Sequence, residues 1–241
     1  MKAMKHAPAH QSILTVENLS VKLGTESIIE NLSFTVQPGE YITIIGSNGS
    51  GKTTLFQALI GIIPYGGTIR WDPDVVIGYV PQRLDLERNL PLSVKDFLES
   101  KGVRAPREDL LVHLKLVGLS PTILRQPLGS LSGGEFQRAL VAFALIGDTN
   151  VLLFDEPTAS IDKPSEEHIY TTLHQLQAEK GLTILTISHD LNFVQRFAEK
   201  VLCLNRRKHF FGVPGDVLQP ERLADFYGNQ QYKFFQHKHE H

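Results

Sequence analysis

Residues 46–54 read GSNGSGKTT, with three glycines and three small polar residues ahead of Lys52, directly after the apolar run YITII at 41–45. Glycine in place of alanine costs roughly 0.5–1 kcal/mol in a helix or strand, so this cluster needs a conformational or steric reason. A flexible loop would be one reason. The spacing of Gly46, Gly51, Lys52 and Thr53 instead matches the phosphate-binding loop, and the flanking strand-like and helix-like runs supply its context.

The chemistry of this segment follows from its backbone. Glycines let successive N–H groups turn toward a phosphate, and the following helix adds the positive end of its dipole. We expect Lys52 to reach the β- and γ-phosphates and the Thr53 hydroxyl to hold Mg²⁺. The predicted nucleotide-binding residues of this loop are Gly46, Ser47, Asn48, Gly49, Ser50, Gly51, Lys52, Thr53 and Thr54.

Composition indicates a globular chain without a strong charge bias. Of its 241 residues, 41% are hydrophobic, and the formal net charge of −2 gives no overall electrostatic case for a nucleic-acid partner. The single cysteine, Cys203, excludes an intramolecular disulfide and is expected to be a small core residue. The first twelve residues lack a secretory signal, and no run approaches the ~20 apolar residues of a membrane span. We expect a cytoplasmic protein.

Strand-like and helical patterns alternate in an order typical of an α/β fold. Residues 12–23 and 28–36 read as N-terminal strands, about 84–147 as helices, and 151–205 as alternating strands and helices. Such alternation implies a mostly parallel sheet with right-handed crossovers. We therefore predict a P-loop NTPase core with N-terminal antiparallel β elements and an inserted α-helical subdomain.

Two acids follow a buried strand in VLLFDEP at 151–157. Ligands of open α/β sheets bind outside the carboxyl ends of the strands. We expect Asp155 to hold Mg²⁺ and Glu156 to be the general base that activates water. Taken alone, the pair could also be two solvated acids at a strand end.

A second glycine-rich helix start, LSGGEFQRAL at 131–140, decides the family. As a helix cap alone it would be unremarkable. With the phosphate loop and Asp155-Glu156 in the same chain order, the sequence from 14 to 204 resembles the ATP-binding cassette family, whose signature is LSGGQ. Glu135 stands in place of the usual glutamine. The resemblance implies a single domain at 12–241, with a RecA-like core at about 12–83 and 148–215, a helical subdomain at about 84–147 and a C-terminal extension at about 216–241.

The resemblance also implies further site residues. Gln82 in YVPQ matches the glutamine that senses Mg²⁺, Asp162 in ASID matches the D-loop, and His189 in TISHD matches the switch histidine at the γ-phosphate. A lone histidine is more often structural, but this one follows an apolar strand. Leu23 stands where the family usually stacks an aromatic residue on adenine, so we expect weaker affinity or selectivity for ATP.

Two such subunits would sandwich two ATP molecules, each phosphate loop facing the other copy's signature. The residues that contact ATP from the second copy would be Leu131, Ser132, Gly133, Gly134 and Glu135. The resemblance implies ATP and Mg²⁺ as cofactors, a homodimer, integral membrane permease subunits, an indirect extracytoplasmic metal-binding protein, no nucleic acid, and a peripheral place on the inner face of the cell membrane.

The main hypothesis for the biological role is a transport ATPase, with two alternatives. A cassette ATPase acting on DNA or ribosomes would usually carry two cassettes or long coiled coils, and this sequence has neither. A P-loop GTPase or kinase is disfavoured because the sequence has no NKxD motif and because LSGGE would be unexplained. The segment 75–98, VVIGYVPQRLDLERNLPLSVKDFL, resembles the metal-uptake branch, most closely the ATPase subunit of zinc importers, with manganese, iron or another small solute as the alternative cargo. Residues 82–97 are expected to form the groove for the permease.

The chain ends in QHKHEH, with His237, His239 and His241 alternating with Lys238 and Glu240. Imidazole suits Zn²⁺, whereas Mn²⁺ prefers oxygen ligands. We hypothesise a weak zinc site at these three histidines; the alternative is a polar chain end without this role.

Overall fold

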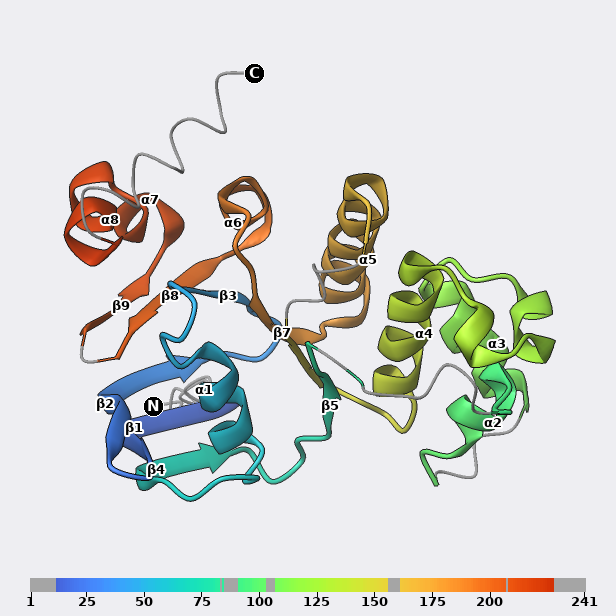
Figure 1. Ribbon diagram of the computed structural model, residues 1–241, viewed down its shortest axis with the longest axis horizontal. Helices are drawn as coiled ribbons and strands as arrows, with labels where there is room; N and C mark the ends of the chain where they lie inside the picture. Colours follow the sequence, from blue (N-terminus) through green and yellow to red (C-terminus); the bar gives the residue numbers. More distant parts are fainter. Residues whose placement is uncertain are drawn as a thin grey trace, which may run out of the picture.

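Two β-sheets organise the described part of the chain, which in this computed structural model comprises residues 12–82, 84, 91–102, 107–155, 161–206 and 208–227. The first is an antiparallel three-stranded sheet of order β2-β1-β4. The second has the order β5-β6-β7-β3-β8-β9 and is parallel except for β9. The predicted mostly parallel sheet with N-terminal antiparallel strands is confirmed (Figure 1).

The strands are β1 (Leu14–Leu23), β2 (Glu26–Val36), β3 (Tyr41–Ile45), β4 (Gly66–Trp71), β5 (Ile77–Val80), β6 (Val151–Phe154), β7 (Thr183–Ile187), β8 (Lys200–Asn205) and β9 (Lys208–Gly212). The helices are α1 (Lys52–Leu59), α2 (Val94–Glu99), α3 (Arg107–Leu116), α4 (Gly133–Leu145), α5 (Lys163–Lys180), α6 (Leu191–Phe197), α7 (Pro214–Val217) and α8 (Pro220–Tyr227). Two 3₁₀ turns, Pro121–Arg125 and Leu128–Ser130, precede α4.

Both faces of the parallel sheet are buried, which is why its inner strands are mostly apolar, with Thr43, Thr183 and Thr186 as buried exceptions. Alternate residues of each strand point to opposite sides. Leu152 and Phe154 pack with α4 and α5, whereas Val151 and Leu153 pack with α1 and the antiparallel sheet. The helix α1 therefore lies between the two sheets, and this fixes the position of the loop before it.

The helices α2, α3 and α4 gather beyond the β5 edge of the sheet (Figure 1). Ser93 caps α2 through a capping box with Asp96. Gly78 of β5 lets α4 approach closely, since a Cβ atom there would lie 2.4 Å from the Ala144 carbonyl oxygen. The Lys101 ammonium donates to the carbonyls of Ala144 and Ile146, so it holds the end of α4. These helices lie within the predicted 84–147 layer.

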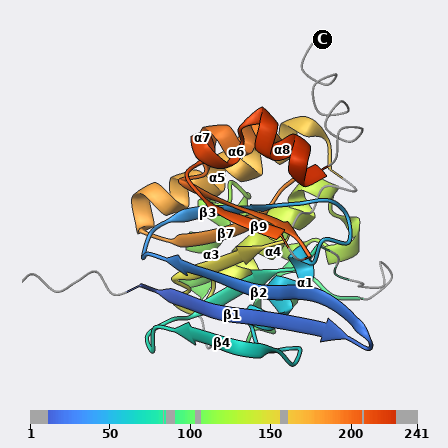
Figure 2. The same ribbon diagram turned by 90° about the vertical axis from the view of Figure 1, so that its left-hand side faces the viewer.

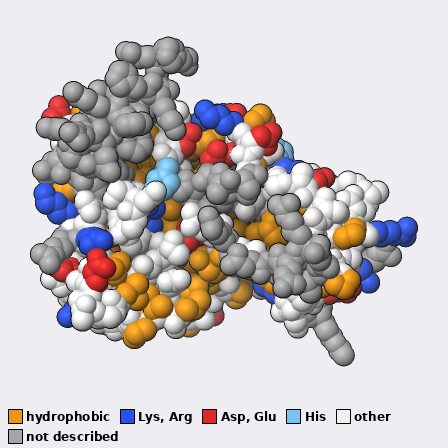
Figure 3. Space-filling view, viewed as in Figure 1, with side chains coloured by type: hydrophobic (Ala, Val, Ile, Leu, Met, Phe, Trp, Pro, Cys, Tyr) orange, Lys and Arg blue, Asp and Glu red, His pale blue; other side chains and the backbone are white. Residues whose placement is uncertain are grey.

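Three further features concern the buried cysteine, the hydrophobic surface and the length and polarity of the helices. Cys203 is buried in β8 as expected, and burial raises the pKa of its thiol to about 12. Hydrophobic side chains gather in the lower part of the face shown in Figure 3, where Figure 1 places β4 and α1. Within the described ranges, every helix is too short or too polar to cross a bilayer.

Candidate nucleotide site

Five parallel strands end at one edge of the six-stranded sheet, which we call the carboxyl edge. The phosphate loop follows β3, and Gln82, Asp155 and His189 follow β5, β6 and β7. Main-chain hydrogen bonds hold these ends in register, from Asp155 N to the Val80 oxygen at 2.9 Å and from Ser188 N to the Ile44 oxygen at 3.2 Å. Residues distant in sequence are thus brought to the edge where open α/β sheets bind ligands.

Glycine occupies these loop positions because neighbouring atoms leave no room for a Cβ atom or because the backbone has a positive φ angle. A Cβ atom on Gly46 would lie 2.2 Å from the Leu204 carbonyl oxygen, and one on Gly51 would lie 2.9 Å from the Ile28 side chain. Gly51 has φ 102° where α1 begins. Gly49 has φ 76° but faces open space, so a ligand can approach its backbone. The loop is closed on its protein side and accessible on its outer side.

Lys52 is held inside this loop. Its side chain is 8% exposed, and its Nζ donates to the carbonyl oxygens of Gly46 at 2.9 Å and Ser47 at 3.1 Å. These contacts place the ammonium charge against the backbone that surrounds a bound phosphate. This position agrees with the predicted role of Lys52 at the β- and γ-phosphates, and that role stays a prediction.

The start of α1 lacks the side-chain caps that other helices of this chain carry. Gly51 makes no side-chain capping bond, and the first turn contains no acidic residue. By contrast, capping boxes satisfy the starts of α2 and α4. Because no side chain caps the start of α1, its first N–H groups and the positive end of its dipole are available to an anion.

Asp155 is 1% exposed and has a partner that the sequence did not reveal. The Tyr79 hydroxyl donates to its carboxylate, and burial, together with the Asp155 charge and this hydrogen bond, raises the pKa of Tyr79 to about 12. The Tyr79 ring also packs edge-on against Phe56 of α1, with centroids 6.3 Å apart. Tyr79 therefore connects the acid to the helix after the phosphate loop; its only sequence signal was its place three residues before Gln82.

The predicted Mg²⁺ ligands fit that ion by their chemistry. Thr53, Gln82 and Asp155 offer a hydroxyl, an amide and a carboxylate oxygen, and Mg²⁺ prefers oxygen ligands. Thr53 lies in the first turn of α1, and the other two follow neighbouring strands. Elsewhere in the described ranges, no group of three His, Cys, Asp or Glu side chains could hold a metal.

The LSGGE segment is satisfied internally in this structure. Glu135 N donates to the Ser132 hydroxyl oxygen at 3.3 Å, and the Glu135 carboxylate accepts from Ser132 N at 3.0 Å and from its hydroxyl at 2.8 Å. The hydrogen bonds from the Ser132 backbone and then its side chain lower the pKa of Glu135. Glu135, which stands in place of the family's glutamine, thus engages both the backbone N–H and the hydroxyl of Ser132.

Gly134 allows α4 to pack closely against the start of α5. A Cβ atom on Gly134 would lie 2.8 Å from the Ser165 hydroxyl oxygen and 3.0 Å from its Cβ. The exposed Asp162 lies just before this contact, at the N-cap of α5. Sequence analysis did not single out Ser165, because only the three-dimensional packing brings it to Gly134.

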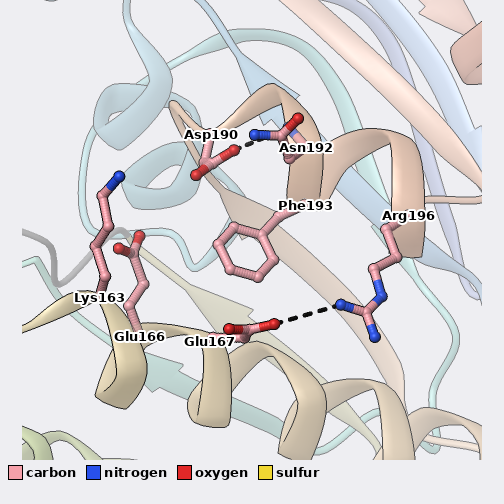
Figure 4. Close-up of a pocket in the computed structure, with 7 residues that line it drawn as sticks. All are labelled: Lys163, Glu166, Glu167, Asp190, Asn192, Phe193 and Arg196. Carbon is pink, nitrogen blue, oxygen red and sulfur yellow. Dashed lines mark hydrogen bonds and ion pairs between the residues drawn. The ribbon is translucent and has the colours of Figure 1, made fainter. Parts of the chain in front are cut away.

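A charged pocket of about 230 Å³ lies between α5 and α6 (Figure 4). Arg196 and Glu167 pair across it at 3.4 Å, and Asp190 accepts from Asn192 N at 2.8 Å. No predicted nucleotide-binding residue lines it. Its lining residues are Lys163, Glu166, Glu167, Asp190, Asn192, Phe193 and Arg196.

Leu23, the predicted adenine contact, lies at the end of β1 and is 48% exposed. Glu156 and the three histidines His237, His239 and His241 lie outside the described residues, so their roles stay predictions.

The fold and the carboxyl edge define an α/β nucleotide-binding protein. The family described as "ABC transporter" matches residues 29–159, and the chain belongs to this family. A zinc import ATP-binding protein of Jannaschia sp. is 42% identical over 89% of this chain and 88% of its own, and one of Yersinia enterocolitica is 39% identical over 95% and 92%.

Solved structures agree with this assignment. An inward-facing metal-chelate type ABC transporter superposes with a TM-score of 0.81 and 28% identity, over 90% of this chain and 89% of that chain. A dimeric ATP-binding cassette with ADP and Pi superposes with a TM-score of 0.70 and 25% identity, over 83% and 98%.

The contact of Gly134 with Ser165 predicts the effect of a single methyl group. Gly134→Ala should destabilise the chain by about 1–3 kcal/mol, because backbone or side chains must shift to relieve the overlap. Urea denaturation measures the loss. Adding Ser165→Gly to Gly134→Ala should restore most of it, while Ser165→Gly alone stays within about 0.5 kcal/mol of the unsubstituted chain. A double variant as unstable as Gly134→Ala would show that this contact is not the cause.

Proposed function

We propose that this chain is the ATP-hydrolysing subunit of a zinc importer and that its homodimer drives a separate membrane permease. The observation that carries the proposal is the carboxyl edge, where the phosphate loop, the buried Asp155 and His189 meet in a chain 42% identical to a zinc import ATP-binding protein. ATP binding and hydrolysis follow from membership of the family. Zinc as cargo and the permease follow from the names of the relatives.

Each residue has a role in hydrolysis under this proposal. The loop amides and Lys52 bind the phosphates, and Thr53, Gln82 and Asp155 would hold Mg²⁺, which neutralises phosphate charge when bound. Glu156 accepts a proton from the water whose oxygen attacks the γ-phosphorus, the bond to the ADP oxygen breaks, and His189 contacts the γ-phosphate. ADP and inorganic phosphate are the products.

Closure of the dimer requires a local exchange of hydrogen bonds. The Ser132 hydroxyl donates to Glu135 in the single chain, so it must leave that carboxylate to donate to a γ-phosphate held by the second copy. Leu131, Gly133 and Gly134 complete the segment that faces this phosphate. Asp162 lies at the start of α5 and would face the second copy beside it.

The transport role assigns the remaining parts of the chain. We propose that the helical layer at 84–147 and the groove at 82–97 receive the permease, and that the core at 12–83 and 148–215 binds nucleotide. The chain would then lie peripherally on the inner face of the membrane, with an extracytoplasmic metal-binding protein as an indirect partner. A metal chelate is the second candidate cargo, favoured by the solved metal-chelate type transporter at 28% identity.

Uptake measurements test the cargo. In cells that lack this subunit, the unsubstituted chain should restore uptake of radioactive zinc but not of manganese. Lys52→Ala, expressed at the same level, should restore neither, because the β- and γ-phosphates lose their neutralising charge. Restored manganese or chelate uptake without zinc would contradict the assignment of zinc, and zinc uptake by Lys52→Ala would contradict coupling to this site.

Turnover measurements test the proposed base. Glu156→Gln should lower the ATPase kcat by at least about 100-fold and leave ATP affinity within a few-fold, since the amide keeps the shape but cannot accept a proton. The ATP-bound dimer should then persist in gel filtration. Turnover near that of the unsubstituted chain would exclude Glu156 as the base.

A further inference from the structure

The turn between β8 and β9 lies directly against the phosphate loop. Arg206 N donates to the Ser50 carbonyl oxygen at 3.4 Å, and Gly46 approaches the Leu204 carbonyl so closely that a Cβ atom there would be 2.2 Å away. Arg206 has φ 44°, a left-handed conformation that non-glycine residues seldom adopt. Arg206 opens the two-residue loop between the paired residues Asn205 and Lys208, and favoured hairpin loops of this length have a positive φ at that position.

The Arg206 side chain is held beside Leu23. Its Nη1 lies 2.7 Å from Glu26 Oε1, and Glu26 pairs directly with Leu23 across the turn between β1 and β2. The turns between β1 and β2 and between β8 and β9 lie at the same end of the molecule in Figures 1 and 2. The Arg206 and Glu26 side chains are 53% and 55% exposed, and ion pairs this exposed contribute little to stability. The ion pair between Arg206 and Glu26 therefore contributes little to the stability of the fold, and the guanidinium remains accessible from solvent.

The strand order indicates where the base of a bound nucleotide must lie. The strand β7 with His189, and then β6 with Asp155, lie on one side of β3, and β8 lies on the other. The γ-phosphate belongs on the side of Asp155 and His189. A nucleotide with its γ-phosphate on that side would carry its ribose and base toward the β8 side, where Arg206 follows the strand.

We propose that Arg206 is a nucleotide-positioning residue whose guanidinium, oriented by Glu26, stacks on the purine base of ATP. A guanidinium is planar, always charged and weakly hydrated, so its face stacks well on aromatic rings. The exposed Leu23 adds apolar contact but no ring. This inference rests on the proposed function, because it assumes that the loop holds ATP.

Calorimetry on the full-length chain tests the proposal with two probes, ATP and inorganic tripolyphosphate, which lacks a base. Arg206→Ala should raise the Kd for ATP about 5- to 20-fold, and leave the Kd for tripolyphosphate within about twofold. Arg206→Lys keeps the charge but loses the planar face, so it should also raise the Kd for ATP, by about threefold or more.

A matched control comes from the antiparallel sheet. Arg70 pairs with Glu17 at 3.2 Å, with side chains 61% and 51% exposed, so Arg70→Ala removes a similar ion pair away from the loop. Arg70→Ala should change neither the Kd for ATP nor the Kd for tripolyphosphate. Glu26→Gln weakens the ion pair with Arg206 and leaves the phosphate loop unchanged. It should raise the Kd for ATP less than Arg206→Ala does and leave the Kd for tripolyphosphate unchanged.

Each other outcome overturns a defined claim. Unchanged ATP affinity in Arg206→Ala, or equal weakening of ATP and tripolyphosphate, would contradict stacking on the base. Full retention of ATP affinity by Arg206→Lys would assign the effect to charge alone and also contradict it. Failure of the unsubstituted chain to bind either probe would instead overturn the proposed function.

Discussion

Parallel pairing of β3 with β7 on one side and β8 on the other is the constraint on which the site depends. Thr43 is the partner of both Thr186 and Val201, so the carboxyl ends of the three strands lie at one edge, with β8 extending two residues past the partner of Ile45. The phosphate loop is consequently enclosed between the His189 segment and the turn that carries Arg206. A shift of one residue in either pair would exchange the buried faces of the strands and separate these groups.

The two glycine-rich helix starts differ in how their hydrogen-bonding groups are satisfied. The start of α1 has no side-chain cap and can receive a phosphate at once. The start of α4 is already satisfied by Ser132 and Glu135, with the carboxylate adding a negative charge where a γ-phosphate would come. Under the proposed function, ATP would bind first at α1 of one copy and then compete with Glu135 of the other for the Ser132 hydroxyl, so that closure of the dimer would respond to the nucleotide.

Sequence patterns predicted the residues whose signal is local. The phosphate loop, Asp155 and His189 each follow an apolar run that could be recognised without knowing its neighbours, and the sheet indeed brings them to one edge. Tyr79, Ser165 and Arg206 were missed because their importance comes from contacts with Asp155, Gly134 and Glu26, which only the fold creates. The elements β9, α7 and α8 were not predicted from the sequence.

Cysteine cross-linking tests the shared nucleotide site most directly. The only native thiol, Cys203, is buried with a raised pKa and should not react. Asn48 and Ser132 are exposed, so a chain carrying N48C and S132C presents one thiol on the phosphate loop and one on LSGGE. The account predicts dimers cross-linked through a short thiol reagent in ATP but not without nucleotide, and none from either single variant. Cross-links independent of ATP, or formed only within one chain, would contradict it.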